Sequence, residues 1–349
     1  MVTDWEKDYR RKSGLRKLAS GGLWQMCHQA HVITFIGAGG KTTSVKKVTE
    51  EIHGFGYPVV ASTTTKVFPD ESFSRWQDSA APPGSTVKYP CFWYAGFDEG
   101  EGKWLGPSLQ VIDQAVAADQ RATGVRGGGK RFWVVEGDGA RGKKLKFWQT
   151  HEPQIPLSTE CAVLVVNGGL WGKPLQAEDV HRPEVFPELI GEIWNAGAVW
   201  AYLLLSSAFE RKYSQMAWVL FFNGLEFRSL KGKKINKEAD KKDDAEHDGD
   251  KNGNWEKNVD IDIDVNGDRE KTEDNKNKDN KNKDAEKDCD TEKDCDGEKN
   301  DDARGMTFAW LEELWRDRPS LTELASGPVH LRLAGGNAKE GEALWFDLW

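Results

Sequence analysis

A short stretch near the N-terminus, Val32 to Ser44 (VITFIGAGGKTTS), constrains the fold of this chain more than any other part of the sequence. It begins with apolar and β-branched residues at positions 32–36, which is the profile of a buried strand. A glycine-rich turn and a Lys-Thr pair follow at once, and the next residues have the apolar spacing of a helix. Strand, glycine-rich turn, Lys-Thr and helix form the arrangement of a phosphate-binding loop.

Each residue type in this stretch suits phosphate binding. Glycines allow backbone N–H groups to approach phosphate oxygens, and a helix N-terminus adds the positive end of its dipole. Lys41 can reach the β- and γ-phosphates, and the Thr42 hydroxyl can ligate Mg²⁺. We therefore predict a site for ATP or GTP with Mg²⁺. The predicted nucleotide-binding residues of the loop are Gly37, Ala38, Gly39, Gly40, Lys41, Thr42 and Thr43.

The spacing of the loop leaves alternatives open. The pattern G-x-x-x-x-G-K-[ST] would place a glycine at position 35, where this chain has Phe35. The shorter form G-x-x-G-K-T-T resembles the loop of the Mur-type peptide ligases. An ATP-dependent ligase or kinase that activates a small acid is therefore one alternative to hydrolysis, and a scaffold that binds nucleotide without turnover is another. The simplest structural alternative is a strand-to-helix turn with an incidental lysine.

A threonine-rich turn follows the next predicted strand, residues 57–62. In α/β sheets, ligands bind at the carboxyl ends of the strands, and this turn comes one strand–helix–strand unit after the phosphate loop. We predict that Thr64, Thr65 and Lys66 face the same crevice as the loop. The alternative is a β-favouring threonine run followed by a solvated lysine.

Two carboxylates follow a third predicted buried strand, residues 131–135. Glu136 and Asp138 are separated by one residue, so in an extended strand their side chains point the same way. Carboxylates at this end of a strand can hold a nucleotide-bound Mg²⁺. We predict Thr42, Glu136 and Asp138 as metal ligands, and Lys41, Glu136 and Asp138 as catalytic residues. The sequence leaves open which carboxylate holds the metal and which orients a nucleophile, and a polar turn is the alternative.

The rest of the ordered sequence indicates the fold class. Further buried strands are predicted at 161–166 and 217–222, with a helix over 194–209 between them. Strands alternating with helices predict a three-layer, P-loop-like α/β domain with a mostly parallel sheet.

A low-complexity segment, residues 231–304, interrupts this pattern. It contains 18 Lys and Arg and 26 Asp and Glu among many Asn and Gly residues, so it cannot bury enough apolar surface to offset the entropy of ordering. We predict a disordered acidic insert here. The nucleotide-binding domain would comprise residues 1–230, and residues 305–349 would complete it with a helix and a strand.

Charge and composition narrow the class of protein. The chain of 349 residues has a net charge of −9, most of which lies in the insert, and its basic residues form no nucleic-acid-binding pattern. No apolar run is long enough to span a bilayer, and the N-terminus has no apolar signal core. Five cysteines at scattered spacings do not form a disulfide framework. We expect a cytoplasmic protein that binds neither nucleic acid nor membrane.

Taken together, the motifs stand in a characteristic order. The chain resembles the YqeC family, described as selenium-dependent hydroxylase accessory proteins, over residues 23–226 and more weakly after the insert. The motifs that carry the resemblance are Phe35–Thr43, Ser62–Pro69, Val135–Ala140, Leu145–Lys146, His151–Pro156, Gly172–Leu175 and Val180–Glu184.

The resemblance implies a P-loop-type nucleotide-binding protein that helps to mature selenium-dependent molybdenum hydroxylases. Its partners would be such a hydroxylase or other maturation factors. It also makes His151, Glu152, His181 and Arg182 candidate residues of the nucleotide site, although local sequence alone favours a solvated pair for the first two.

Three features depart from the family pattern. Gly137 stands where the family's acidic motif has Ala, and the long insert is not a family feature. The late strand ends in Asn223-Gly224-Leu225-Glu226, where the family tends to have an Asn-Lys/Gln-x-Asp-like motif, as in base recognition by GTPases. The sequence therefore does not select GTP over ATP.

Overall fold

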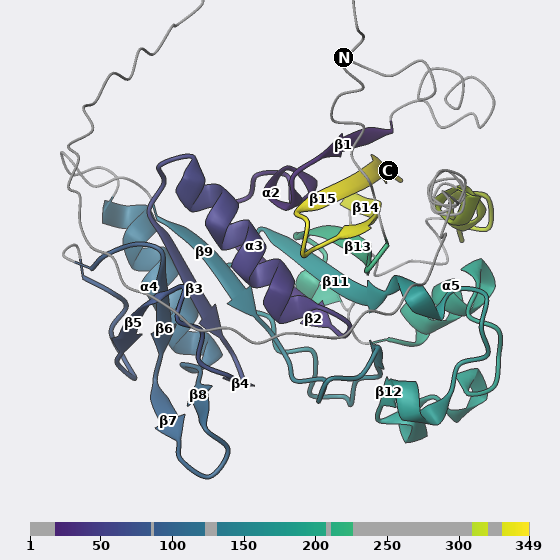
Figure 1. Cartoon of the computed structure of the whole chain (residues 1–349), viewed down its shortest axis with the longest axis horizontal. Coiled ribbons are helices and arrows are strands. Elements are labelled where there is room, and N and C mark those ends of the chain that lie inside the picture. The colour runs from purple at the N-terminus through teal and green to yellow at the C-terminus, as the bar shows by residue number, and fades with distance from the viewer. Residues whose placement is uncertain are drawn as a thin grey trace, which may run out of the picture. The chain divides into compact units, whose positions relative to one another are not determined.

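A mostly parallel sheet positions the phosphate loop in the computed structural model (Figure 1). The structure describes residues 18–84, 87–122, 131–206, 211–225, 309–319 and 330–348. Within them the ten strands follow the order β1 (Ala19–Gly21), β15 (Glu342–Asp347), β14 (His330–Asn337), β13 (Ala217–Asn223), β11 (Cys161–Asn167), β2 (Val32–Gly37), β9 (Phe132–Glu136), β3 (Val59–Thr63), β6 (Cys91–Tyr94) and β5 (Ser74–Gln77). The strands from β14 to β5 are parallel, and only the edge pairings of β15 with β14 and of β1 with β15 are antiparallel. The predicted α/β class with a mostly parallel sheet is confirmed.

Helices lie on both faces of this sheet (Figure 1). On one face, α2 (Leu23–Met26) and α3 (Lys41–Gly54) pack on alternate strand residues such as Ile33 and Phe35. On the other face, α4 (Leu109–Ala122) packs on β9 and β3, while α5 (Ala196–Leu205) and a helical segment at 309–316 pack on β11, β13 and β14. Central strands that are apolar on both sides bury both faces.

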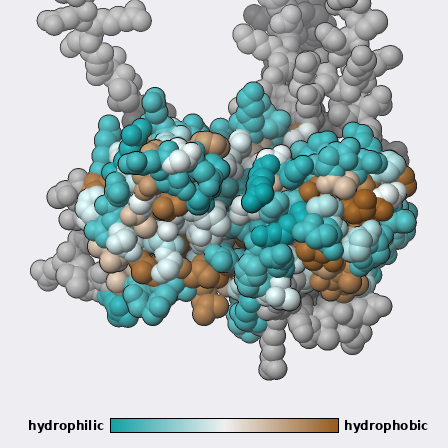
Figure 2. Space-filling model, turned by 90° about the horizontal axis from the view of Figure 1, so that it is seen from below, coloured by the Kyte–Doolittle hydropathy of each residue, from teal (hydrophilic) through white to brown (hydrophobic). Residues whose placement is uncertain are grey.

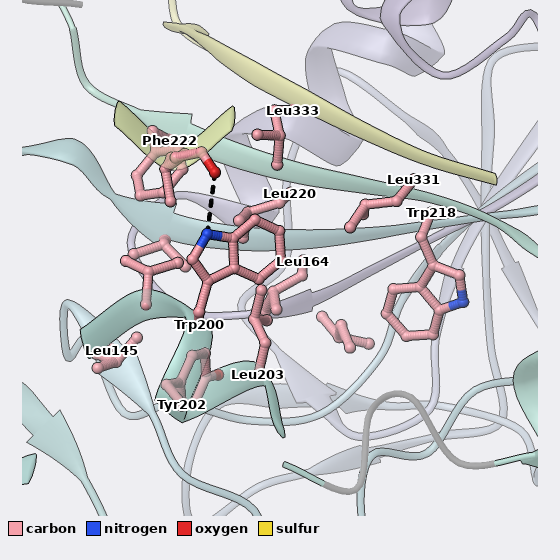
Figure 3. Packing of buried hydrophobic residues seen from close by; sticks show 14 of the residues in the cluster. Leu145, Leu164, Trp200, Tyr202, Leu203, Trp218, Leu220, Phe222, Leu331 and Leu333 are labelled. Atoms are coloured by element: carbon pink, nitrogen blue, oxygen red, sulfur yellow. Dashed lines mark hydrogen bonds between the residues drawn. The ribbon is translucent and has the colours of Figure 1, made fainter. Parts of the chain in front are cut away.

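The core under α5 joins parts of the chain that are far apart in sequence. Trp200 of α5 lies among Leu164, Leu220 and Leu333 from three neighbouring strands (Figure 3). Its indole N–H donates a hydrogen bond of 3.0 Å to the backbone carbonyl of Leu314 in the 309–316 segment. Residues that follow the low-complexity segment therefore belong to the same core as residues that precede it.

Smaller elements surround the sheet. A three-stranded antiparallel sheet has the order β4 (Lys66–Val67), β8 (Lys103–Leu105) and β7 (Gly96–Asp98), and β10 (Leu145–Lys146) pairs in parallel with β12 (Val180–His181). Short 3-10 helices lie at Gly168–Leu170, Ala177–Asp179, Pro183–Val185, Pro187–Leu189 and Arg211–Tyr213. The β10–β12 pair brings Lys146 to within 3.6 Å of Asp138, which follows β9 in the chain.

The predicted elements and the observed ones agree best in the central strands. The helix predicted over 194–209 is observed at Ala196–Leu205, where the Asn195 side chain caps it by accepting a hydrogen bond from Ala198 N. The insert at 231–304 lies outside the described residues, so its disorder and the domain boundaries stay predictions.

The surface mixes hydrophilic residues with separate apolar patches on the face that Figure 2 shows. Exposed large apolar side chains include Phe55, Phe68, Phe97 and Leu157. Isolated apolar residues of this kind are usual on protein surfaces. Among the described helices, none is both long and apolar enough to cross a membrane.

Candidate functional site

The glycine-rich loop joins β2 to α3 at the carboxyl end of the central strands. Gly37, Gly39 and Gly40 have φ angles of +88°, +85° and +128°, which favour glycine. A Cβ atom on Gly37 would lie 2.4 Å from the Val165 carbonyl oxygen of β11. Ala38 N donates a 2.9 Å hydrogen bond to the same oxygen. The close approach to β11 and the backbone angles together explain why the sequence has glycines here.

Lys41, the first residue of α3, folds back over the loop. Its amine donates a hydrogen bond of 2.7 Å to the Gly37 carbonyl oxygen. It also lies 3.7 Å from Asp138 Oδ1 and 4.0 Å from Glu136 Oε1. The side chain is 6% exposed, so these charges interact with little screening by solvent. The predicted cation of the loop and both predicted carboxylates therefore form one cluster.

Thr42 and Glu136 are linked directly. The Thr42 hydroxyl donates a hydrogen bond of 2.8 Å to Glu136 Oε2. Burial raises the pKa of the Glu136 carboxyl, although the Lys41 charge and the Thr42 hydroxyl oppose the shift. Thr42 is exposed whereas Glu136 is buried, so this hydrogen bond links the exposed first turn of α3 to the buried cluster.

Asp138 is fully buried and holds the start of the loop. Oδ1 accepts a 3.2 Å hydrogen bond from Gly37 N, and Oδ2 accepts one from the Trp148 indole N–H. Lys146 Nζ lies 3.6 Å from Oδ2. Burial raises the pKa of Asp138, while Lys41 and Lys146 oppose this. The carboxylate is therefore surrounded by donors from the loop and from the β10 segment.

A chain of ionic contacts continues from Asp138 to the β12 segment. Lys146 Nζ donates 2.9 Å to Glu152 Oε1 and 2.8 Å to the Gly139 carbonyl oxygen. The guanidinium of Arg182 donates to Glu152 Oε2. Burial favours the neutral form of Glu152, but its hydrogen bond to Lys146 and the charge of Lys146 outweigh this, so its pKa is lowered. Glu152 and Arg182, which the family resemblance makes candidate site residues, thus lie in the loop cluster, and their role in nucleotide binding stays a prediction.

His181 lies beside this chain because β12 pairs with β10, which places it opposite Lys146. Burial, followed by the charges of Lys146, Arg182 and Arg141, lowers the pKa of His181 to about 4. Arg182 has a φ of +67°, a backbone conformation that is uncommon outside glycine. Strained residues of this type cluster at functional sites.

The lowered pKa of His181 predicts a pH-dependent stability. The unfolded chain takes up this proton near pH 6.5 and the folded chain only near pH 4, so stability is lost as the pH falls through that interval. Between pH 7 and 5, wild-type protein should lose about 1 kcal/mol more unfolding free energy than His181→Gln, allowing for solvent screening. Urea unfolding at both pH values measures this. His53→Gln, an exposed histidine of α3, should behave as wild type; identical profiles for wild type and His181→Gln would contradict the prediction.

Of the threonine turn, Thr64 lies beside the site, whereas the side chain of Lys66 points to other partners. Thr64 N donates to the Glu136 carbonyl oxygen at 2.9 Å, and Thr64 Oγ1 lies 3.4 Å from the Gln154 carbonyl oxygen. Lys66 instead donates to Asp98 Oδ2 at 2.6 Å and to Glu101 Oε1 at 2.7 Å, on the small antiparallel sheet. Thr65 contributes its backbone carbonyl to Gly106 N. Lys66 is therefore engaged away from the loop.

His151 also lies apart from the loop cluster. Its neighbour Glu152 points to Lys146, whereas His151 is exposed and lines a cavity of about 580 Å³ beside α4. Leu109 and Asp113 of α4, together with Ile155 and Tyr213, form part of the wall. His151 lies in a turn that is closed by a hydrogen bond of 2.9 Å from Glu152 N to the Gln149 carbonyl oxygen.

Three side chains that were not predicted as site residues complete the cluster. Lys146 and Trp148 contact Asp138, and Asn223 at the end of β13 is hydrogen-bonded to the backbone of the loop. Asn223 Nδ2 donates 2.7 Å to the Gly39 carbonyl oxygen, while its Oδ1 accepts from Ala338 N at 2.8 Å. The sequence signals for Asn223 were its position after an apolar strand and its place in the family's late motif. These bonds tie Asn223 to the protein backbone.

The described residues provide few groups for a metal on their own. Among them, no group of three or more His, Cys, Asp or Glu side chains could hold a metal ion. Thr42 and Glu136 nevertheless offer two hard oxygen donors side by side. Mg²⁺ at nucleotide sites commonly takes one or two protein ligands and fills the remaining positions with phosphate oxygens and water. The donor set fits such an ion.

Fold and site define an α/β protein whose glycine-rich loop and buried acidic cluster meet at the carboxyl edge of a parallel sheet. Residues 33–184 match the family model described as YqeC protein, so this part of the chain is similar to the YqeC family. The chain is 31% identical over 166 residues to the "Uncharacterized protein YqeC" of Escherichia coli (strain K12), an alignment that covers 46% of this chain and 60% of that protein. No match to a solved structure was found.

Proposed function

We propose that this protein binds ATP or GTP together with Mg²⁺ at the loop formed by residues 37–43, as a P-loop-like nucleotide-binding protein. The observation that carries the proposal is the 2.8 Å hydrogen bond from Thr42 to Glu136, made at the first turn of α3 beside the buried amine of Lys41. A hydroxyl paired with a carboxylate next to a lysine and a helix N-terminus is the donor set that a Mg²⁺-nucleotide requires.

Each part of the cluster has a role in this proposal. The N-terminus of α3 binds phosphate oxygens together with the backbone N–H groups of the loop other than those of Gly37 and Ala38, which donate to Asp138 and to the Val165 carbonyl. Lys41 leaves the Gly37 carbonyl and neutralises phosphate charge. Thr42 and Glu136 hold Mg²⁺, which supplies charge stabilisation at the phosphoryl group when bound. In this proposal Glu136 also orients an attacking water, which would make the protein an NTPase.

The cellular role that we propose is maturation of a selenium-dependent molybdenum hydroxylase, with the hydroxylase or another maturation factor as partner. The resemblance of the motifs to the accessory-protein family supports this role. Phosphate release from MgATP and MgGTP should be measured with and without a candidate hydroxylase. Stimulation of turnover by the hydroxylase would support the role, and nucleotide turnover that no hydroxylase affects would argue against it.

A ligase or kinase that activates a small acid is the second candidate. It is favoured by the short G-x-x-G-K-T-T loop and by the cationic Arg182 beside Glu152, which could bind an anionic second substrate. ATP labelled in its γ-phosphate separates the candidates. Label in inorganic phosphate alone, without any second substrate, indicates hydrolysis, whereas label on a second substrate, or phosphate release that requires a small acid, indicates activation. Retained nucleotide without release indicates a binding scaffold.

The Thr42 hydroxyl should determine how strongly nucleotide binding depends on Mg²⁺. Thr42→Val keeps the shape of the side chain but removes the metal ligand, so affinity for MgATP should fall by about tenfold, while affinity measured in EDTA stays near that of wild type. Thr42→Ser keeps the hydroxyl and should bind MgATP within about threefold of wild type. Calorimetric titration measures each value. Equal Mg²⁺ dependence in wild type and Thr42→Val would contradict the assignment.

A further inference from the structure

Asp138 is unusual because cations approach both of its oxygens. Lys41 from the loop lies 3.7 Å from Oδ1, and Lys146 from β10 lies 3.6 Å from Oδ2. The side chain of Asp138 is 0% exposed. A buried carboxylate is costly unless it is paired and hydrogen-bonded, so the loss of either cation matters.

The two lysines are held very differently. Lys146 is 1% exposed, and its amine makes two short hydrogen bonds, to Gly139 O and Glu152 Oε1. Its backbone is fixed as well, since Tyr202 OH donates 2.9 Å to its carbonyl oxygen. Among the contacts that define the cluster, Lys41 makes one short hydrogen bond, to a carbonyl of its own loop. Lys146 is therefore a fixed cation, and Lys41 is the one that can move.

We propose that Lys146 is a positioning residue that remains with Asp138 as its counter-ion, so that Lys41 can leave Asp138 and move to the phosphates. This inference rests on the proposed nucleotide binding. It also assigns Asp138 a role distinct from that of Glu136. Asp138 accepts the hydrogen bond from Gly37 N and balances the charges of the two lysines, whereas Glu136 and Thr42 provide the oxygens for Mg²⁺.

If Lys146 and Lys41 share Asp138 as a counter-ion in this way, two substitutions should change the reactivity of Lys41 in opposite directions. Both are measured on the full-length protein without nucleotide. Lys146→Met leaves Asp138 with Lys41 alone, so acetylation of Lys41 by acetic anhydride should become about three- to fivefold slower. Asp138→Asn releases Lys41, which should be acetylated about three- to fivefold faster. Peptide mass spectrometry reports the rate at Lys41. Lys173→Met, which removes an exposed lysine that donates to Gly169 O, is the control and should not change the rate.

The direction of the change separates positioning from a merely structural role. If Lys146 only stabilises the fold, Lys146→Met loosens the core and Lys41 reacts faster, which would overturn the proposal. The double variant Lys146→Met/Asp138→Asn should react at the rate of Asp138→Asn, and Lys146→Arg, which keeps the charge, should resemble wild type. If Lys146→Met does not fold, Asp138→Asn still tests the proposal. An unchanged rate of Lys41 acetylation in Asp138→Asn overturns it.

Nucleotide binding provides the second measurement. Lys146→Met should bind MgATP about tenfold more weakly than wild type, and adding Asp138→Asn should restore affinity to within about threefold. If the second substitution does not restore binding, Lys146 is not the counter-ion that frees Lys41 from Asp138, and the proposal is overturned. If wild-type protein binds neither MgATP nor MgGTP, the proposed function fails, whereas the acetylation rates still decide how Lys146, Asp138 and Lys41 are coupled.

Discussion

Lys41→Met should weaken the binding of MgATP or MgGTP by about 10- to 100-fold, because a charge-assisted hydrogen bond to phosphate contributes about 1.5–3 kcal/mol. Methionine has nearly the length of lysine and keeps the helix propensity of this first position of α3. It removes the amine that lies within 4.0 Å of both Glu136 and Asp138. Calorimetric titration of the purified variant measures the loss.

Lys46→Met provides a matched control on the same helix. Lys46 lies about one turn further along α3 and pairs with Asp70 at 3.0 Å, away from the loop. This partly exposed ion pair contributes about 0–1 kcal/mol to stability, so the control should bind nucleotide as wild type does. If Lys41→Met and Lys46→Met bind MgATP equally well, Lys41 is not the phosphate-binding lysine.

Trp200→Ala should cost about 3–5 kcal/mol of unfolding free energy, because it empties the core between α5 and the sheet. Trp200 is 4% exposed and packs against leucines of three strands (Figure 3). Its indole N–H is also bonded to Leu314 O, so the substitution leaves that carbonyl without this donor. Urea denaturation followed by circular dichroism measures the change.

Leu204→Ala on the same helix is the control for this stability prediction. Leu204 is 49% exposed, so truncating it should change the unfolding free energy by less than about 0.5 kcal/mol. A comparable loss for both variants would mean that α5 does not pack as described. A small loss for Trp200→Ala alone would show that the 309–316 segment does not share this core.

The central strands and the loop could be predicted from sequence because their signals are local. Residues 32–36 are continuously apolar or β-branched, and Gly37 and Gly40 follow where the chain needs positive φ angles. The pairing of Glu136 with Thr42 was also predictable in outline. Glu136 ends β9, and Thr42 begins the helix after the neighbouring parallel strand β2, so both lie at the carboxyl edge of the sheet.

Other parts of the site depend on tertiary contacts that no local pattern reveals. Lys146 reads as one lysine among several in Lys143-Lys144-Leu145-Lys146, and only the pairing of β10 with β12 buries it beside Asp138 and Glu152. Asn223 supports the loop because β13 lies two strands from β2, with β11 between them. Sheet order of this kind cannot be read from the spacing of residues.

Lys66 is a predicted site residue whose amine the structure pairs elsewhere, with Asp98 and Glu101. A lysine after a threonine turn beside a phosphate loop favours a ligand role, but Asp98 and Glu101 on a neighbouring hairpin bind its amine at 2.6 and 2.7 Å. The short strands β7 and β8 that present these carboxylates have little apolar periodicity. Their pairing was therefore not predicted, and neither was the competitor for Lys66.

Titration of the full-length protein with MgATP and MgGTP, each repeated in EDTA, tests nucleotide binding most directly. Occupancy of the loop through Thr42 and Glu136 predicts saturable binding of at least one nucleotide at one site per chain, with affinity lowered about tenfold or more without Mg²⁺. The same titration with Lys41→Met should show the further loss described above. Absence of binding by wild-type protein to both nucleotides would contradict the proposed function.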